Sequence, residues 1–253
     1  IGYGLDELPN DITGTTSACC EPAIDYCIVK VPRFDFVKFP GVDQTLTTQM
    51  KSVGEVMAIG RTFKEALQKA LRSLEQDRYG WGADGEDEVE AWEIPSGERK
   101  GYLEEVKRQL RIPTPERIFA LRHALQLGMS TSEVCELTGI DPWFINNLKQ
   151  LVEFEAKLRE ELPSLVGAEE GKGILWEAKR LGYSDRQLAC LAGNNEEAIR
   201  SWREGLEIKP VYKLVDSCAG EYHAKTPYFY STYESGNEAR ATGKNTVIVL
   251  GGG

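Results

Sequence analysis

Histidine and clustered cysteine are scarce in this sequence, and their scarcity argues against a zinc site. The two histidines, His123 and His223, lie far apart in the chain. The six cysteines form no C-x-x-C pair and have no regular spacing: Cys19, Cys20, Cys27, Cys135, Cys190 and Cys218. Because zinc ligands are usually closely spaced in sequence, we predict no metal site. Scattered thiols of this kind are typical of reduced cysteines in a cytosolic protein.

Long apolar runs and an excess of basic residues are also missing. No run approaches the roughly 20 apolar residues that cross a bilayer, and the first residues lack the basic and apolar regions of a signal peptide. We therefore expect a cytoplasmic chain that does not associate with membranes. Lys and Arg total 30 against 40 Asp and Glu, which gives a formal charge of −10. Since phosphate backbones are bound by concentrated Lys and Arg, this balance weakens a general role in nucleic-acid binding.

The beginning of the chain predicts a helix end and one strand. Residues 1–10 are expected to be the last part of a helix that a proline stops. Residues 24–31 are rich in β-branched and aromatic side chains and precede Pro32, so we predict a strand that ends there. Lys30 and Arg33 lie at its far end. They are either surface charges beside the strand or candidates to neutralise an anion.

A second strand contains an isolated acid. Residues 53–59 are apolar except for Glu55, and the strand stops at Gly60, after which Thr62 can cap a helix over residues 63–74. A charged side chain is rarely buried unless it is paired or functional. Glu55 therefore either faces water at a sheet edge or lines an internal polar space.

The middle of the chain changes from irregular to helical. Residues 77–100 are rich in Gly, Trp and acids and have no period, so they are predicted to be a long linker. The next helix ends before Pro113 and has a narrow apolar stripe of Leu103, Val106 and Leu110. This stripe is either a self-association face or the cap of a helical bundle.

An internal repeat with an offset of 54 residues occupies the helical part. Ser130, Val134, Leu137, Thr138, Gly139 and Ile145 recur as Ser184, Leu188, Leu191, Ala192, Gly193 and Ile199. Each copy predicts a capped short helix, a glycine turn and a second helix, which is the helix-turn-helix pattern. Such a motif can read DNA, but neither second helix has a basic face. We expect two stacked helical pairs, with DNA binding or a purely structural interaction module as the alternative.

The last part of the chain is β-prone. Residues 228–233 are aromatic, and residues 246–250 predict a buried strand that runs into Gly251, Gly252 and Gly253. No helix follows this glycine loop, so it lacks the helix N-terminus that would bind a phosphate. We therefore assign no cofactor-binding residue to it.

Several motifs resemble one enzyme family. Residues 47–62 are similar to the segment that ends the first synthetase half of the carbamoyl-phosphate synthase large subunit. Other segments, on both sides of this one, resemble the same family in the same order. They are residues 5–8, 10–13, 21–22, 24–26 and 30–34, Asp141 with Trp143 and Phe144, and residues 210–213, 230–234 and 249–253. The resemblance implies that this chain is a fragment.

The resemblance also implies a domain division. Residues 1–76 would be the C-terminal part of the first ATP-grasp (carboxyphosphate) domain, and residues 77–100 the linker. Residues 101–210 would be the helical oligomerization domain, and residues 211–253 the start of the second synthetase half. The expected fold is mainly α: a helical bundle preceded by an incomplete α/β ATP-grasp module and followed by a β-prone tail.

The implied activity is ATP-dependent synthesis of carbamoyl phosphate from bicarbonate and ammonia, for arginine and pyrimidine synthesis. A small glutaminase subunit would be the partner that supplies ammonia from glutamine. In the complete enzyme ATP with Mg or Mn would be needed, but no complete catalytic, cofactor or metal site is expected in this fragment, which should be inactive alone. By resemblance, Glu55 would line the tunnel for carbamate, and Lys30 and Arg33 would lie near the carboxyphosphate chemistry.

Overall fold

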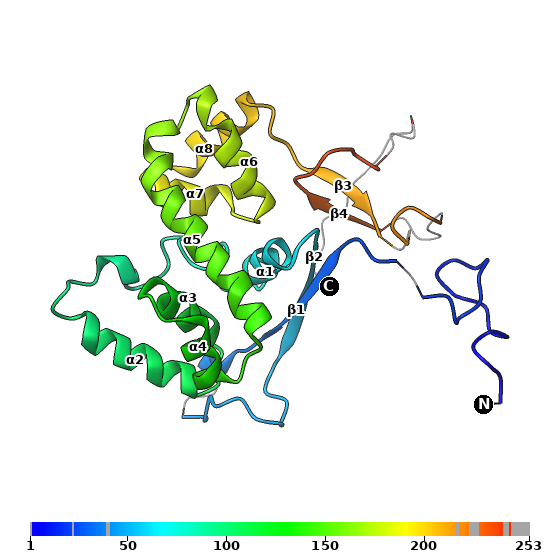
Figure 1. The fold of residues 1–253 in the computed structure, drawn as a ribbon, viewed down its shortest axis with the longest axis horizontal. Coiled ribbons are helices and arrows are strands. Elements are labelled where there is room, and N and C mark those ends of the chain that lie inside the picture. Colours follow the sequence, from blue (N-terminus) through cyan, green and yellow to red (C-terminus); the bar gives the residue numbers. More distant parts are fainter. Residues whose placement is uncertain are drawn as a thin grey trace. The chain divides into compact units, whose positions relative to one another are not determined.

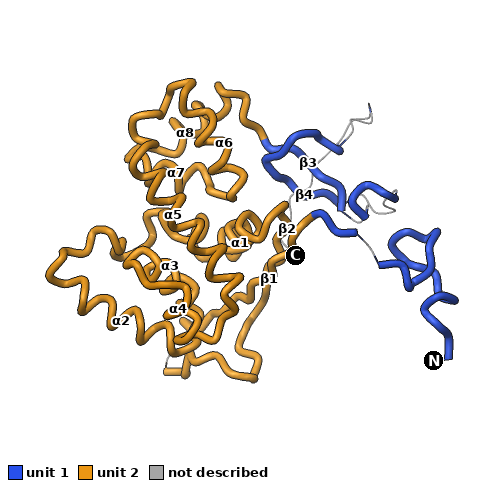
Figure 2. The backbone as a smooth tube through the Cα atoms, viewed as in Figure 1, with its two compact units in different colours: residues 1–25, 210–253 blue, residues 26–209 orange. Residues whose placement is uncertain are grey.

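The chain forms two compact units in the computed structural model (Figure 2). The larger unit is residues 26–209, and the smaller unit combines residues 1–25 with residues 210–253. The structure describes residues 2–21, 23–38, 41–215, 218–222, 228–239 and 243. As predicted, the described part is mainly helical, with two small two-stranded sheets (Figure 1).

The larger unit begins with a β-hairpin that packs on one helix. Strands β1 (Cys27–Arg33) and β2 (Gly54–Gly60) are antiparallel and α1 (Phe63–Arg72) covers one face of the pair. Thr62 caps α1 as predicted, because its hydroxyl accepts a hydrogen bond from the Glu65 amide. The prediction that β1 ends before Pro32 was wrong. Proline is tolerated there because β1 pairs on one side only among the described residues.

In the described part of the chain seven α-helices follow α1, and α5 is the longest of them. It contacts α1, α3, α4 and α7, and Figure 1 shows it running through the helical part. Leucines at regular helical spacing form its buried side: Leu148, Leu151, Leu158 and Leu162. The elements are α2 (Arg99–Arg111), α3 (Arg117–Gln126), α4 (Thr131–Thr138), α5 (Pro142–Leu165), α6 (Lys172–Arg180), α7 (Asp185–Ala192) and α8 (Glu196–Gly205), with short 3-10 turns η1 (Phe36–Lys38), η2 (Ala91–Glu93) and η3 (Glu169–Gly171).

The structure confirms the 54-residue repeat. Ser130 and Ser184 each form a capping box at the start of a short helix, α4 and α7. Gly139 and Gly193 end these helices in the left-handed conformation. The repeat also extends further towards the N-terminus than the sequence showed. The turns from α3 to α4 and from α6 to α7 have the same backbone hydrogen bonds, offset by 54 residues.

Residues 77–98 have no α-helix or β-strand, yet residues 80–84, Ala91 and Ile94 are buried. The Trp81 side chain and Asp84 are almost fully enclosed. The Trp81 amide donates to Gln68 Oε1 of α1 at 2.8 Å, and its indole nitrogen donates to the Ile118 carbonyl of α3 at 2.7 Å. The Gln68 side chain of α1 thus satisfies one amide of this irregular backbone, and a backbone carbonyl of α3 accepts from the Trp81 ring.

The smaller unit contains an antiparallel pair, β3 (Val211–Leu214) and β4 (Phe229–Thr232), which agrees with the β-prone pattern of the sequence. The helix end predicted for residues 1–10 is wrong. Residues 2–10 contain no helix, and residues 5–7 form a turn in which the Glu7 amide donates to the Gly4 carbonyl at 3.1 Å. The Gly4 amide also donates to the Glu7 carboxylate at 2.8 Å, and such local side-chain bonds compete with a helix. The strand predicted at residues 246–250 and its glycines lie outside the described residues.

Candidate functional site

The exposed face of the β1–β2 hairpin brings two predicted site residues together. Lys30 Nζ lies 2.8 Å from Glu55 Oε1, and each side chain is 58% exposed. The register places Lys30 opposite Met57 and Glu55 opposite Pro32, so all four point away from α1. An ion pair this exposed contributes less than about 1 kcal/mol to stability. Both charges are therefore available to a polar molecule on this face.

Arg33 does not join this pair. It lies three residues after Lys30, and an odd spacing in a strand places two side chains on opposite faces. Its guanidinium lies 3.6 Å from the exposed carboxylate of Glu75. The structure thus separates the two basic residues that the sequence placed side by side.

The start of α1 fixes the end of β2. Glu65 Oε2 accepts from the Arg61 amide at 2.8 Å, and Lys69 Nζ donates to the Ile59 carbonyl at 2.5 Å. Gly60 is needed here, because a Cβ would lie 3.0 Å from the Ala66 nitrogen. These contacts hold the strand that carries Glu55 rigidly against the helix.

The apolar stripe of α2 is mostly internal. Val106 and Leu110 are buried within the chain, where α2 packs on α3 and α4. Leu103 is half-buried. Of the three predicted interface residues, Leu103 alone keeps exposed surface for a second molecule.

A buried charge cluster, which the sequence did not reveal, links residues 78–90 to α3 and α5. The Arg122 guanidinium lies 2.8 Å from Glu155, 3.0 Å from Asp87 and 2.9 Å from Glu90. Arg78 pairs with Asp87 at 2.9 Å and with the fully buried Asp84 at 3.1 Å. Four carboxylates thus share two guanidinium groups. The signal in the sequence was an arginine among the apolar residues of α3.

This charge imbalance alters the proton affinity of the acids. Burial, together with the neighbouring Asp87 and Glu155 charges, raises the pKa of Glu90 to about 7 against the attraction of Arg122. Burial also disfavours the ionised form of Asp87, but hydrogen bonding and charge from Arg78 and the charge of Arg122 lower its pKa overall. Burial and Arg122 lower the pKa of His123, whose Nδ1 lies 2.6 Å from the Tyr102 hydroxyl.

Asp87, Glu90 and His123 are the residues of the described chain that approach the geometry of a metal site. One ligand atom of each lies within 4.8 Å of the others. However, Arg122 already lies at ion-pair distance from both carboxylates, and Arg78 lies at ion-pair distance from Asp87. A cation would have to displace a guanidinium, so the geometry fits an ion-pair network better than a metal centre.

Helices α5 and α8 have few basic groups for a DNA backbone. Lys149 lies 3.8 Å from Glu153, and Arg200 lies 2.7 Å from Glu196. Arg203 is buried against Asp185. Since each of these cations has an acidic neighbour, the geometry does not favour a DNA-reading surface.

The chain is similar over its whole length to proteins of one family. Residues 55–207 match the family model described as carbamoyl-phosphate synthetase large chain, oligomerisation domain. The carbamoyl phosphate synthase large chains of Archaeoglobus fulgidus and of Nostoc sp. are each 53% identical over the whole of this chain. The arginine-specific chloroplastic large chain of Arabidopsis thaliana is 46% identical, also over the whole chain.

This chain belongs to the carbamoyl-phosphate synthase large-chain family. It spans 22% of the length of the Archaeoglobus and Nostoc synthases and 20% of the Arabidopsis one. The predicted family is therefore confirmed, and the helical part of the larger unit lies within the oligomerisation domain of that family. In the described residues no helix is long and apolar enough to cross a membrane.

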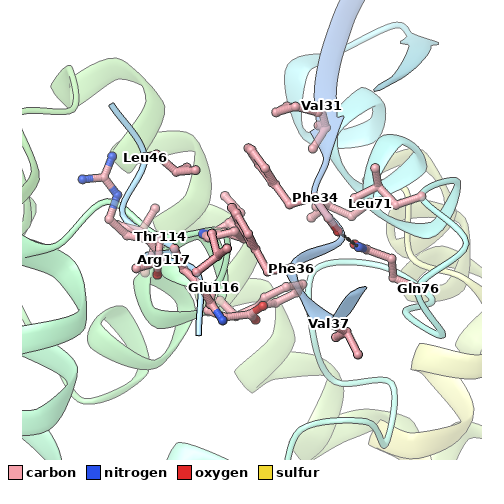
Figure 3. A pocket seen from close by; sticks show the side chains of 18 of the residues that line it. Val31, Phe34, Phe36, Val37, Leu46, Leu71, Gln76, Thr114, Glu116 and Arg117 are labelled. Atoms are coloured by element: carbon pink, nitrogen blue, oxygen red, sulfur yellow. Dashed lines mark hydrogen bonds between the residues drawn. The ribbon is translucent and has the colours of Figure 1, made fainter. Parts of the chain in front are cut away.

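The synthase segment also contains an apolar cavity of about 660 Å³ within the larger unit (Figure 3). Side chains of β1, η1, α1 and the start of α3 line it, including Phe34, Leu71 and Arg117. Gln76 donates to the Phe34 carbonyl at its edge. The rings of Phe34 and Phe36 stack on each other, with their centroids 5.8 Å apart. Few polar groups converge in the cavity, so it has little to orient a ligand.

Proposed function

We propose that this chain is a scaffold segment in the large chain of a glutamine-dependent carbamoyl-phosphate synthase, an ATP-dependent ligase. The identity of 53% to two synthase large chains over the whole segment supports this most directly. The complete enzyme would make carbamoyl phosphate from bicarbonate, ATP and ammonia, with ammonia released from glutamine by a small subunit. Its product would serve arginine and pyrimidine synthesis in the cytoplasm.

In this proposal the segment joins two synthetase halves. Residues 1–76 complete the carboxyphosphate half, residues 77–100 connect it to the helices of residues 101–210, and residues 211–253 begin the second half. The groups that bind ATP and Mg or Mn belong to other parts of the longer chain. The 253-residue polypeptide alone should therefore not hydrolyse ATP, whereas the complete chain with its small subunit should form carbamoyl phosphate.

Glu55 would line the passage for carbamate between the halves. The support is its position on the open face of the hairpin, where it is charged and exposed in this segment. Glu55→Ala in the complete enzyme should uncouple bicarbonate-dependent ATP hydrolysis from product formation, because carbamate would no longer be oriented. Glu75→Ala removes an acid that is 82% exposed and is the matched control. Normal coupling in Glu55→Ala would exclude the tunnel role.

Lys30 and Arg33 would neutralise a phosphate or bicarbonate oxygen in the first half. The structure favours Lys30 of the two, because it shares the open face with Glu55. Lys30→Met should lower bicarbonate-dependent ATP hydrolysis more than Arg33→Met does. Equal effects of the two variants would argue against a specific role for Lys30.

The helices would mediate self-association through α2. Leu103→Glu should shift the 253-residue polypeptide towards monomers in sedimentation velocity, because a charge would enter an apolar contact. Val106 and Leu110 are unsuitable tests, since their replacement would disturb the chain's own core. Gln109→Glu, at an exposed position of the same helix, is the control. An unchanged sedimentation profile for Leu103→Glu would contradict this face.

A further inference from the structure

Three aromatic side chains, two of them exposed and Phe63 half-buried, form a cluster where α1 and α5 begin. Phe63, Trp143 and Phe144, here called the aromatic patch, have ring centroids 5.0 to 5.4 Å apart. Trp143 is 54% exposed and Phe144 is 43% exposed. Large aromatic side chains that gather on a surface are typical of binding sites, because their burial contributes much of the affinity of an interface.

The backbone holds these rings in fixed positions. Asp141 caps α5 by accepting a hydrogen bond from the Trp143 amide at 2.8 Å, and Pro142 occupies the first turn. The Asn147 side chain donates to the Trp143 carbonyl at 2.9 Å. Phe63 is the first residue of α1. A surface built on two rigid helix starts loses little entropy when a partner covers it.

The β1–β2 hairpin next to the aromatic patch forms a sheet of two strands with open edges among the described residues. Among the described residues, β1 and β2 pair only with each other. Their outer face exposes apolar side chains, with Met57 65% and Ile28 46% exposed. A two-stranded sheet with open edges is marginal by itself and normally continues into further strands. The outer face of the hairpin and the aromatic patch are thus both left exposed by the residues that the structure describes. Only Arg61 and Thr62 separate β2 from α1.

The length of the relatives indicates what supplies that cover. This chain spans 22% of the Archaeoglobus synthase, so most of such an enzyme lies outside these 253 residues. We propose that the aromatic patch is a docking surface for the remainder of the synthetase half to which residues 1–76 belong. The proposal rests on the proposed function and adds a role for α5. Trp143 and Phe144 of α5 bind this synthetase half to the helical region.

A second copy of the chain is the competing occupant. The self-association face proposed above lies on α2, and α2 makes its main contacts with α3 and α4. The aromatic patch is instead continuous with the hairpin and α1, which belong to the incomplete sheet. Continuity with that sheet favours the same long chain over a second molecule.

Hydroxyl-radical footprinting of Trp143 tests the proposal directly. The oxidation rate of Trp143 would be measured in the 253-residue polypeptide and in the complete synthase chain, with Trp202 as a reference that is buried in this segment. We expect Trp143 to be protected about fivefold in the complete chain, because a docked surface excludes water. In the polypeptide its rate should not change with protein concentration.

Two results would overturn the proposal. Equal oxidation of Trp143 in both proteins would show that nothing covers the aromatic patch in the complete chain. Protection that appears in the polypeptide as its concentration rises would assign the surface to a second copy. The footprint is independent of activity, so a complete chain that forms no carbamoyl phosphate would contradict the proposed function but not the docking surface.

Variants separate docking from folding. Trp143→Ser with Phe144→Ser should lower bicarbonate-dependent ATP hydrolysis of the complete enzyme, whereas Trp143→Phe should preserve it. The double variant of the 253-residue polypeptide should retain its helical circular dichroism, because both rings are substantially exposed. Normal ATP hydrolysis by the double variant of the complete enzyme would contradict the proposal.

Discussion

The two copies of the repeat share their local structure but differ in their surroundings. In both, a serine capping box begins a short helix and a left-handed glycine ends it. In α4, however, Val134 is the buried residue, whereas most of α7 is buried. The difference arises because α7 contacts α5, α8 and the segment at residues 80–86, while α4 packs on α2, α3 and α5. The same caps therefore produce helices with very different tertiary roles.

Charge shows the contrast most clearly. In the second copy Asp185 is buried between Lys179 at 2.8 Å and Arg203 at 3.0 Å. Burial lowers the pKa of Lys179 to about 8, although Asp185 opposes this. In the first copy the equivalent of Asp185 is Thr131 and that of Arg203 is Lys149, whose side chain is exposed. The second copy thus holds α6, α7 and α8 together through ion pairs that the first copy lacks.

Removal of the shared acid should have the largest effect. Asp185→Ala leaves two buried cations without their carboxylate and should lower the free energy of unfolding by about 3–5 kcal/mol. Thr131→Ala at the equivalent position should change it by less than about 0.5 kcal/mol, as surface substitutions do. Urea unfolding of both variants measures this difference. Similar losses in the two copies would mean that the ion pairs do not distinguish them.

The glycine before each capping box gives the second test. Gly182 and Gly128 both have positive φ, +91° and +87°, but their surroundings differ. A Cβ at Gly182 would lie 2.9 Å from the Glu65 Cα of α1, whereas nothing lies within 4 Å of one at Gly128. Gly182→Ala should cost about 3 kcal/mol from backbone strain and overpacking. Gly128→Ala should cost about 1 kcal/mol from strain alone. Thermal unfolding of each variant would compare the two costs, and equal costs would contradict the close packing of α1 on the second copy.

The protonation of Glu90 should make stability depend on pH, and this tests the charges of residues 77–98, the segment that contacts the second copy. Since the folded pKa of about 7 exceeds the ordinary value of 4.5, the folded state binds more protons between these values. Stability should therefore fall as pH rises from 4.5 to about 7 and then level off. Glu90→Gln removes this penalty and should stabilise the chain by about 2 kcal/mol at pH 8.

Urea unfolding at pH 5 and pH 8 checks the effect of Glu90→Gln. At pH 5 the gain should be small, because folded Glu90 is already protonated. Glu88→Gln, in the same segment but outside the Arg122 cluster, is the control. A gain that is the same at both pH values would indicate that the charge of Glu90 is not the cause.

The two caps should give the smallest and most similar effects. Ser184→Ala and Ser130→Ala each remove one hydroxyl that accepts a hydrogen bond from a backbone amide at the start of a helix. Each should cost about 1 kcal/mol in thermal unfolding. Clearly unequal costs would show that burial changes the strength of a cap as well as the surroundings of its helix.

Prediction from the sequence succeeded where the pattern was local. The strand 53–59 with its Thr62 cap, the helix after it and the 54-residue repeat were all confirmed, because period and capping residues specify them. It failed at residues 1–10, where Leu5 and Leu8 stay exposed and hydrogen bonds between Gly4 and Glu7 close a turn. The domain boundaries and the roles of Lys30, Arg33, Glu55 and Leu103 stay predictions.

The Arg122 cluster could not be predicted, because Asp87 lies 35 residues before Arg122 and Glu155 lies 33 residues after it, and the fold alone brings these segments together. The aromatic patch was missed for a related reason. Trp143 and Phe144 are adjacent in sequence, but Phe63 joins them only when α1 packs against α5.

By itself the sequence determined the family, the mainly helical class, and the starts and ends of the repeated helices. These depend on side chains within a few residues of one another and on motifs read in order. Tertiary structure alone decided which copy of the repeat is buried and which charges are enclosed. It also placed Lys30 beside Glu55 and left Trp143 exposed. Burial and ion pairing depend on distances between remote segments, and those distances exist only once the helices pack.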